Sequence, residues 1–362
     1  MTILQDQRLD SISWPELQSL PSEERAPYYM SGHGPYHALF SQQFDRPFLD
    51  RMCDLATRTR QIAKTRGGMT FLQGLLSEKR VMLYFAQPST RTFLSFLSAC
   101  QIVGLRTGEV RDSRTSSEVK GESPEDTVRT FSSFFDMIIM RHPEAGFAER
   151  IAWLLSNSER PVPVINAGSG KDQHPTQALL DVYTLQRSFE QSGGVEGKTV
   201  AFVGDLARGR TVRSLALLLT HYPGVAQYFV APSGLQIGQD ILSELDRRKV
   251  DYRVAESLDA ILPEVDAVYM TRIQDEWDAA GSQPIDVHAY AIDSTRIARM
   301  KEDAVIMHPL PRREEVSPDV DSDPRAVYWR QVRNGMWIRT ALILHIFERD
   351  RDVDLYYQDL VR

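Results

Sequence analysis

Short apolar runs alternate with helical patterns along this chain, and this alternation restricts its fold more than any other feature. Runs rich in β-branched and aromatic residues, typical of buried strands, fall at 81–86, 137–141 and 162–166, and again at 199–203, 227–231, 267–270 and 304–307. Because two parallel strands need a crossover connection, usually a helix, the alternation predicts parallel βαβ units. We therefore expect an α/β protein with two doubly wound parallel-sheet domains.

A polar leader precedes the first set of strands, and a glycine-containing connection separates the two sets. Residues 1–37 have few periodic apolar positions and carry Pro15, Pro21, Pro27 and Pro35. We expect this leader to be partly disordered or to drape over the body. The first domain then covers 38–186, and the second covers 187–333. Residues 334–362 form a C-terminal segment whose first half has the amphipathic pattern of a helix.

The composition fits two such domains and excludes several classes of function. With 362 residues, 42% of them hydrophobic, the chain is long enough to bury two cores. A formal net charge of -7 gives no basic surface for nucleic acid, and no apolar run has membrane-spanning length. The sequence shows no signal peptide, and Cys53 and Cys100 alone make no disulfide framework. We expect a soluble, cytoplasmic protein.

The segment Ser89-Thr90-Arg91-Thr92 has the character of a phosphate cradle. It follows the first strand-like run and opens a helical pattern. At such a turn the backbone N–H groups and the positive end of the helix dipole attract an anion, while hydroxyls and a guanidinium add donors. Ser89 or Thr90 as a simple helix cap, with Arg91 solvated, is an equally good interpretation of this segment alone.

Two further candidate donors follow strand-like runs. A glycine-rich loop leads to His174-Pro175, where a helix is expected to open because proline is favoured at the first helical position. A histidine there tends to stay neutral and to donate a hydrogen bond to a carbonyl, since the helix dipole disfavours its charged form. Arg141 ends another apolar run, and open α/β sheets bind ligands at the carboxyl ends of their strands. A histidine at a helix start is, by itself, more often structural than catalytic.

Taken together, these features resemble the aspartate carbamoyltransferases, within the wider family that also includes the ornithine carbamoyltransferases. The matching segments follow one another in family order from about residue 38 onward. They are Ser89-Thr90-Arg91-Thr92, 116–122, Met140-Arg141-His142-Pro143, His174-Pro175-Thr176-Gln177, 204–211, 270–274 and 308–312. Of these, Arg272-Ile273-Gln274 and His308-Pro309-Leu310-Pro311 resemble the aspartate-using branch, which favours a dicarboxylate acceptor.

The resemblance implies a role for each matching residue. It implies that the phosphate of carbamoyl phosphate is held by Ser89, Thr90, Arg91, Thr92 and Arg141, with Ser116 and Lys120 supplied by a neighbouring subunit. Thr92, Arg141 and His174 would polarise the carbamoyl oxygen and, with Arg91, form the catalytic group. The carbamoyl nitrogen would be held by Gln177 and the carbonyls of Pro309 and Leu310, and aspartate by Lys120, Arg210, Arg272 and Gln274.

The same resemblance implies the reaction and the assembly. Carbamoyl phosphate and L-aspartate would give N-carbamoyl-L-aspartate and phosphate, a step of pyrimidine biosynthesis, in an active-site cleft between the two domains. Negative charge builds on the carbamoyl oxygen as the amine attacks, so the site needs fixed donors and cations rather than a covalent nucleophile, a cofactor or a metal. The family implies a homotrimer or a multiple of trimers with shared sites, and a C-terminal helix that packs back on the first domain. Association with other pyrimidine-pathway or regulatory chains stays open.

Several of these residues also have plain structural interpretations. Ser116 and Lys120 lie in a stretch that alone indicates only a polar loop, although such loops often carry binding residues. The segment from Gly204 to Arg210 follows a strand-like run but lacks the three-glycine spacing of a dinucleotide site. Arg272 at a strand end is, without the resemblance, as readily a surface charge.

The chain also departs from the family pattern at five positions. Gln87 replaces a usual Glu and Trp277 a usual Arg, and in relatives these two positions belong to one bridge that forms on domain closure. Because both partners are replaced, no unpaired buried charge would remain, which indicates an altered closure. Phe93, Leu97 and Ser169 replace a usual Arg, Glu and Asp. Two alternatives therefore stay open: a transcarbamylase for another amine, or a weakly catalytic paralogue that acts as a scaffold.

Overall fold

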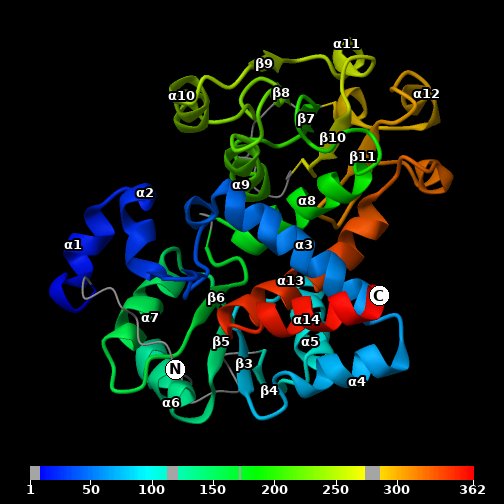
Figure 1. Cartoon of the computed structure of the whole chain (residues 1–362). Helices are drawn as coiled ribbons and strands as arrows, with labels where there is room; N and C mark the ends of the chain where they lie inside the picture. Colours follow the sequence, from blue (N-terminus) through cyan, green and yellow to red (C-terminus); the bar gives the residue numbers. More distant parts are fainter. Residues whose placement is uncertain (1–8, 112–120, 171–172, 274–285) are drawn as a thin grey trace. The chain divides into compact units, whose positions relative to one another are not determined.

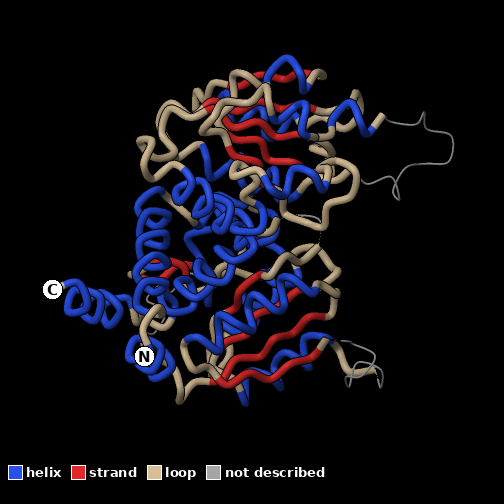
Figure 2. The backbone as a smooth tube through the Cα atoms, turned by 90° about the vertical axis from the view of Figure 1, so that its right-hand side faces the viewer, coloured by secondary structure: helices blue, strands red, loops and turns tan. Residues whose placement is uncertain are grey.

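The computed structural model describes residues 9–111, 121–170, 173–273 and 286–362. They form two compact units, one made of the chain up to Leu180 together with Gly335–Arg362, the other of Asp181–Asn334. Each unit contains one parallel sheet, and Figures 1 and 2 show the strands of each sheet side by side. The expected α/β class with two parallel-sheet domains is confirmed.

The sheet of the first unit has the order β4-β3-β5-β6. Its strands are β3 (Arg80–Phe85), β4 (Arg106–Val110), β5 (Met137–Arg141) and β6 (Val164–Asn166). The chain starts this sheet at β3, adds β4 on one side, and then returns to add β5 and β6 on the other. Because crossover connections are right-handed, this reversal puts helices on both faces of the sheet, as a doubly wound fold requires.

Helices connect and cover these strands. In this unit they are α1 (Trp14–Ser19), α2 (Ser22–Arg25), α3 (Arg46–Ile62), α4 (Arg66–Gly74), α5 (Thr90–Ile102), α6 (Pro124–Phe134) and α7 (Phe147–Ser156). Their starts follow local rules: Asp45 accepts a hydrogen bond from the Phe48 N–H at 2.9 Å to cap α3, and Ser123 caps α6 just before Pro124. Between α2 and α3 lies a two-stranded hairpin, β1 (Met30–Ser31) with β2 (Gly34–Pro35).

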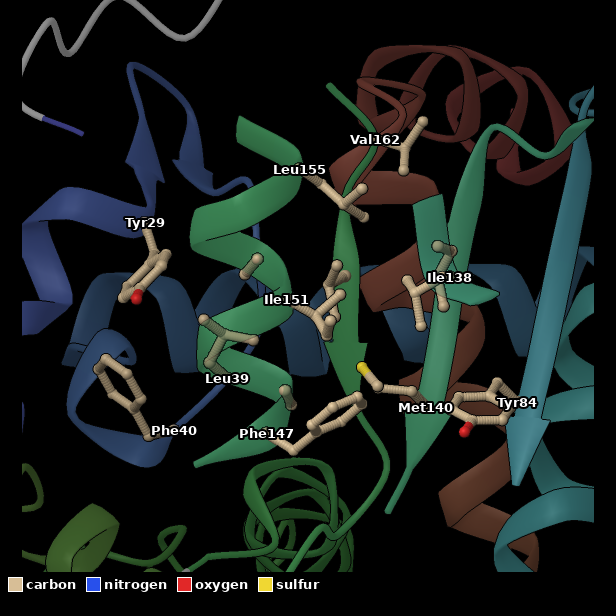
Figure 3. Close-up of a cluster of buried hydrophobic side chains, with 14 of the residues drawn as sticks. Tyr29, Leu39, Phe40, Tyr84, Ile138, Met140, Phe147, Ile151, Leu155 and Val162 are labelled. Carbon is tan, nitrogen blue, oxygen red and sulfur yellow. The ribbon is translucent and has the colours of Figure 1, made fainter. Parts of the chain in front are cut away.

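The described part of the leader packs on the first unit, which is the draped arrangement. Figure 3 shows α7 between strand β5, with Ile138 and Met140, and a layer that contains Tyr29 and Phe40. Leu17 and Tyr29 are fully buried, and the Trp153 indole N–H donates to the Ile12 carbonyl at 3.0 Å. The segment looked polar in sequence because its few apolar residues are scattered over short helices rather than repeated along a long one.

The chain passes between the units within two helices, α8 (Pro175–Ser188) and α13 (Tyr328–Ile346), and ends in α14 (Asp350–Val361). Helix α14 lies against α3. There Arg51 binds Asp350 at 3.0 Å and Asp354 at 2.9 Å. Charge pairs therefore join the last helix of the chain to α3.

The sheet of the second unit has the order β11-β10-β7-β8-β9. Its strands are β7 (Thr199–Val203), β8 (Ala226–Val230), β9 (Tyr252–Ala255), β10 (Ala267–Met270) and β11 (Val305–Met307), and its other helices are α9 (Arg210–Leu219), α10 (Gln239–Arg247), α11 (Leu258–Ile261) and α12 (Ser294–Ile297). Here too the order reverses: β8 and β9 are added on one side of β7, β10 and β11 on the other.

Strands β4 and β9 were not predicted. Both are edge strands, and each has half-buried and exposed residues instead of the buried run of a central strand. The sequence Arg106-Thr107-Gly108-Glu109-Val110 accordingly has no apolar pattern. Within the described ranges, no helix is both long and apolar enough to cross a membrane.

Candidate functional site

The predicted phosphate cradle lies at a topological switch point of the first sheet. Strands β3 and β5 are neighbours, and their connections leave in opposite directions, which is the position where open α/β sheets bind ligands. The segment Ser89–Thr92 follows β3 into the start of α5, and Arg141 is the last residue of β5. The Gln87 N–H donates to the Arg141 carbonyl at 3.1 Å, so the two strand ends are joined directly.

The start of helix α5 brings two of the predicted hydroxyl groups together. Ser89 is the N-cap residue of α5, yet its hydroxyl makes no capping hydrogen bond and instead donates to Thr92 Oγ1 at 3.0 Å. The simple capping interpretation of Ser89 is therefore wrong. Thr92 is buried, whereas Thr90 and Arg91 are exposed. The start of α5 thus carries the paired hydroxyls of Ser89 and Thr92 beside backbone N–H groups for which the helix itself supplies no acceptor.

Arg91 is at the electrostatically unfavourable end of its helix. It is the second residue of α5, where the helix dipole is positive and disfavours a cation. Burial of part of its guanidinium lowers the pKa of Arg91, although arginine stays protonated at any physiological pH. A bound dianion would compensate both effects, because it interacts favourably with the helix terminus and with the guanidinium.

Arg141 and His174 flank the same glycine. Gly168 has a φ of +100°, and a Cβ atom built on it would lie 2.6 Å from His174 Cδ2 and 2.9 Å from Arg141 Nη1. Both side chains are buried, and Arg141 Nη1 donates to the Ala167 carbonyl at 3.3 Å. The structure therefore brings these two predicted donors together, and only a residue without a side chain fits between them.

His174 directly precedes α8, as predicted, and Gln177 lies in the first turn of that helix. The helix begins at Pro175, and the Gln177 N–H donates to the His174 carbonyl at 2.9 Å. The preceding loop is held by Asn166, whose Oδ1 accepts hydrogen bonds from the N–H groups of Gly168 and Ser169 at 2.9 and 2.8 Å. Sequence reasoning missed Asn166 and Gly168, although an Asn followed by glycines between a strand and a helix is a recognisable turn signal.

Ser169, one of the departures from the family pattern, has a structural partner. Its Oγ accepts a hydrogen bond from the His142 N–H at 3.1 Å, and the residue is buried. This bond links the loop after β6 to His142, the first residue after β5. Ser169 thus contributes to the position of the loop that contains Gly168.

In the second unit, Arg210 and Arg272 follow neighbouring strands. Arg210 is the first residue of α9, after β7, and Arg272 comes two residues after the end of β10. Strands β7 and β10 flank the switch point of this sheet, and Thr271 Oγ1 donates to the Val203 carbonyl at 2.9 Å. Two half-buried arginines after neighbouring strands suit the binding of carboxylates, which accept paired hydrogen bonds from guanidinium groups.

Pro309 and Leu310 follow β11, the strand next to β10. Ser116, Lys120, Gln274 and Trp277 lie outside the described residues, so the structure gives no position for them. Among the residues that the structure does describe, no three His, Cys, Asp or Glu side chains gather as ligands for a metal ion. The geometry of the two units thus offers donors for a phosphate and a carbonyl oxygen in one, and for carboxylates in the other.

Known protein families match both units. Residues 37–187 match the model of the aspartate/ornithine carbamoyltransferase carbamoyl-P binding domain, and residues 196–346 match that of the Asp/Orn binding domain.

Individual relatives agree with these matches. The chain is 42% identical over 308 residues to the chloroplastic aspartate carbamoyltransferase of Arabidopsis thaliana, covering 83% of this chain and 75% of that protein. It is 40% identical over 308 residues to the catalytic subunit of aspartate carbamoyltransferase from Chromobacterium violaceum, covering 85% and 96%.

A solved structure, aspartate transcarbamoylase from Trypanosoma cruzi in complex with carbamoyl phosphate and aspartate, is similar with a TM-score of 0.73 at 35% identity. The similarity covers 85% of this chain and 95% of that one. Domain models over most of the sequence, relatives at about two-fifths identity and a shared fold all agree, and this chain belongs to the aspartate/ornithine carbamoyltransferase family.

Proposed function

We propose that this protein is an aspartate carbamoyltransferase, which transfers the carbamoyl group of carbamoyl phosphate to the amine of L-aspartate in pyrimidine biosynthesis. The amine nitrogen forms a bond to the carbamoyl carbon and loses a proton, while the bond from that carbon to the phosphate oxygen breaks. The observation that carries the proposal is the meeting of Arg141 and His174 at Gly168, with Arg141 joined to the segment that leads into α5 through the Gln87 N–H. That arrangement supplies donors for both the carbamoyl oxygen and the departing phosphate.

Within the first unit, we propose one role for each described residue. Ser89, Thr90, Arg91 and Thr92 hold the phosphate at the start of α5, and Arg141 reaches it from β5. Thr92, Arg141 and His174 donate to the carbamoyl oxygen, on which negative charge grows during attack, and Gln177 accepts from the carbamoyl nitrogen. The burial of Arg141 and His174 supports these roles, because donors in a region of low dielectric stabilise charge more strongly.

The acceptor and the assembly complete the proposal. Arg210 and Arg272 bind the carboxylates of aspartate with Gln274, the carbonyls of Pro309 and Leu310 hold the carbamoyl nitrogen, and Ser116 and Lys120 come from a neighbouring subunit. The chain then acts as a homotrimer or a multiple of trimers, with domains at 38–186 and 187–333. A cytoplasmic location is part of the proposal and suits the free thiols of Cys53 and Cys100.

The relatives described above support aspartate as the acceptor. Each of them is named for aspartate, and none supports another amine or a scaffold role. Gln87 follows β3, and its backbone N–H is hydrogen-bonded to Arg141, beside the proposed phosphate site. A Gln in place of the usual Glu removes a negative charge there, but it removes no hydrogen-bond donor. We propose that this departure alters domain closure and leaves the reaction unchanged.

The test is a steady-state assay with carbamoyl phosphate and L-aspartate, following the ureido product and phosphate together, beside a panel of other amines. The wild-type protein is expected to form N-carbamoyl-L-aspartate and one phosphate per product. Arg91→Ala should reduce kcat/KM by about 10²- to 10³-fold, the usual effect of removing one donor to developing charge.

Arg66 provides the matched control, because it is an exposed arginine at the first position of helix α4, which precedes strand β3. Arg66→Ala should leave kcat/KM within twofold of wild type. Carbamoylation of another amine with none of aspartate would refute the choice of acceptor. A response to Arg91→Ala no larger than that to Arg66→Ala would refute the cradle.

A further inference from the structure

The segment after β11 has a backbone conformation that needs support from its surroundings. Leu310 has a φ of +58°, in the left-handed region that residues other than glycine rarely adopt. This conformation has a higher free energy than an ordinary one, so it persists only where neighbouring groups hold it. In this protein the holding groups are His308 and Glu315.

His308 binds the backbone of Leu310. The imidazole is buried, its Nδ1 accepts a hydrogen bond from the Leu310 N–H at 2.7 Å, and its Nε2 is 2.8 Å from Glu315 Oε1. Because Nδ1 accepts from an N–H, the proton of the neutral ring is assigned to Nε2, which donates to the carboxylate. One ring thus connects the Leu310 backbone to Glu315.

Glu315 holds the other end of the segment. Its Oε1 also accepts a hydrogen bond from the Arg313 N–H at 3.0 Å, and the residue is 2% exposed. Burial alone would raise the pKa of Glu315, but the hydrogen bonds from His308 and from backbone N–H groups together hold it below its ordinary value. Glu315 is therefore a buried carboxylate that binds the chain on both sides of Pro311.

A second set of hydrogen bonds holds the backbone of His308. The His308 N–H donates to Gln331 Oε1 at 2.9 Å, and Gln331 Nε2 donates to Asp181 Oδ1 at 2.7 Å. The Tyr269 hydroxyl donates to the other oxygen of Asp181 at 2.8 Å. All of these residues belong to the second unit and are buried, so the position of His308 is fixed from the strand side as well.

We infer that the His308–Glu315 pair is a positioning device that presents the carbonyls of Pro309 and Leu310 to the N–H groups of the carbamoyl substrate, and so sets the preference for carbamoyl phosphate over acyl phosphates without a nitrogen. The inference rests on the proposed function. A site that hydrogen-bonds a substrate N–H strongly rejects an analogue that lacks it, because its own polar groups are then left unpaired. Loss of the device should therefore affect the carbamoyl nitrogen more than the phosphate.

A buried His–Glu pair more often serves stability alone, and the test separates the two roles. The measurement is the KM for carbamoyl phosphate together with the inhibition constants of acetyl phosphate, which has a methyl group in place of the NH2, and of inorganic phosphate. Glu315→Ala should raise the KM for carbamoyl phosphate at least tenfold, while both inhibition constants stay within about threefold. Glu315→Gln keeps an oxygen acceptor for both N–H groups and should retain most of the preference.

Gln227 provides a control for destabilisation. It is fully buried near the amino end of strand β8, and its Nε2 donates to the Ala216 carbonyl at 2.9 Å. Gln227→Ala therefore removes a buried hydrogen bond from the same unit, away from residues 308–315, and should leave the preference for carbamoyl phosphate unchanged. Glu315→Asp, which is too short to reach His308 and Arg313 together, repeats the test if Glu315→Ala does not fold.

Each outcome decides between the explanations. A preference that survives in Glu315→Ala, or that falls equally in Gln227→Ala, overturns the positioning role while the proposed function stands. Wild-type protein that does not carbamoylate aspartate in the same assay overturns the proposed function, and with it the inference. Selective loss of the preference in Glu315→Ala with retention in Glu315→Gln is the supporting result.

Discussion

Replacement of Gly168 by alanine tests the geometry that joins Arg141 to His174. The added methyl group would lie 2.6 Å from His174 Cδ2 and 2.9 Å from Arg141 Nη1, closer than such contacts allow. A non-glycine residue at positive φ destabilises the folded state by about 1–2 kcal/mol, and an extra methyl group in a filled site destabilises it by about 1–3 kcal/mol. The free energy of unfolding should therefore fall by about 2–5 kcal/mol if the two side chains stay in place.

If the side chains move instead, activity falls. A displacement of about 1 Å in a catalytic group reduces the rate about 100-fold, so the substitution should lower either stability, or kcat, or both. Urea unfolding and initial-rate assays on the same protein preparation measure the two effects.

Gly193→Ala is the matched control. Gly193 has a φ of +91°, and a Cβ atom added to it would have no neighbouring atom within 4 Å, so this variant has the backbone effect without the contacts. It should lose only about 1–2 kcal/mol of stability and keep the wild-type kcat. A Gly168→Ala protein that is as stable and as active as Gly193→Ala would refute the close approach of Arg141 and His174.

Two further predictions concern buried titratable groups. Burial lowers the pKa of His37 to about 3, so below the ordinary value near 6.5 the unfolded chain takes up a proton that the folded protein excludes. The contribution of neutral His37 to the free energy of unfolding is therefore fully present above the ordinary pKa. It should decrease by about 1.4 kcal/mol per pH unit as the pH falls from there toward 3. Urea titrations at several pH values should show this slope in wild type and in His33→Asn, at an exposed histidine, but a shallower one in His37→Asn. Burial also raises the pKa of Cys100 to about 12 and that of Cys53 higher still, so neither thiol should react with a disulfide reagent at pH 8 until urea unfolds the protein; rapid reaction of the native protein would contradict their burial.

Central strands were predictable because each carries its own signal. Strands β3, β5, β7 and β10 are buried over nearly their whole length and therefore appear in the sequence as apolar runs. The edge strand β9 does not appear as an apolar run, because its residues are half-buried or exposed. The packing of the leader was likewise hard to predict, since the burial of Tyr29 depends on α7 and β5, which come much later in the sequence.

The candidate site shows the same division. His174 at a helix start and Ser89–Thr92 after a strand were predicted because a turn and its capping residues are specified within a few positions. Asn166 was missed because its hydrogen bonds to Gly168 and Ser169 become important only once that loop is placed beside Arg141. The roles assigned from family resemblance remain predictions for the assays above.

The sequence by itself determined the class of fold, the central strands and the chemical character of the loops that follow them, because periodicity, turn residues and hydroxyl or guanidinium donors are local properties of the chain. Only the tertiary structure decided the order of the strands, with its reversals between β3 and β5 and between β7 and β10. It also decided that Gly168 separates Arg141 from His174 and that Glu315 holds Leu310 through His308. These relations depend on parallel pairing and packing between distant segments, which no local pattern specifies.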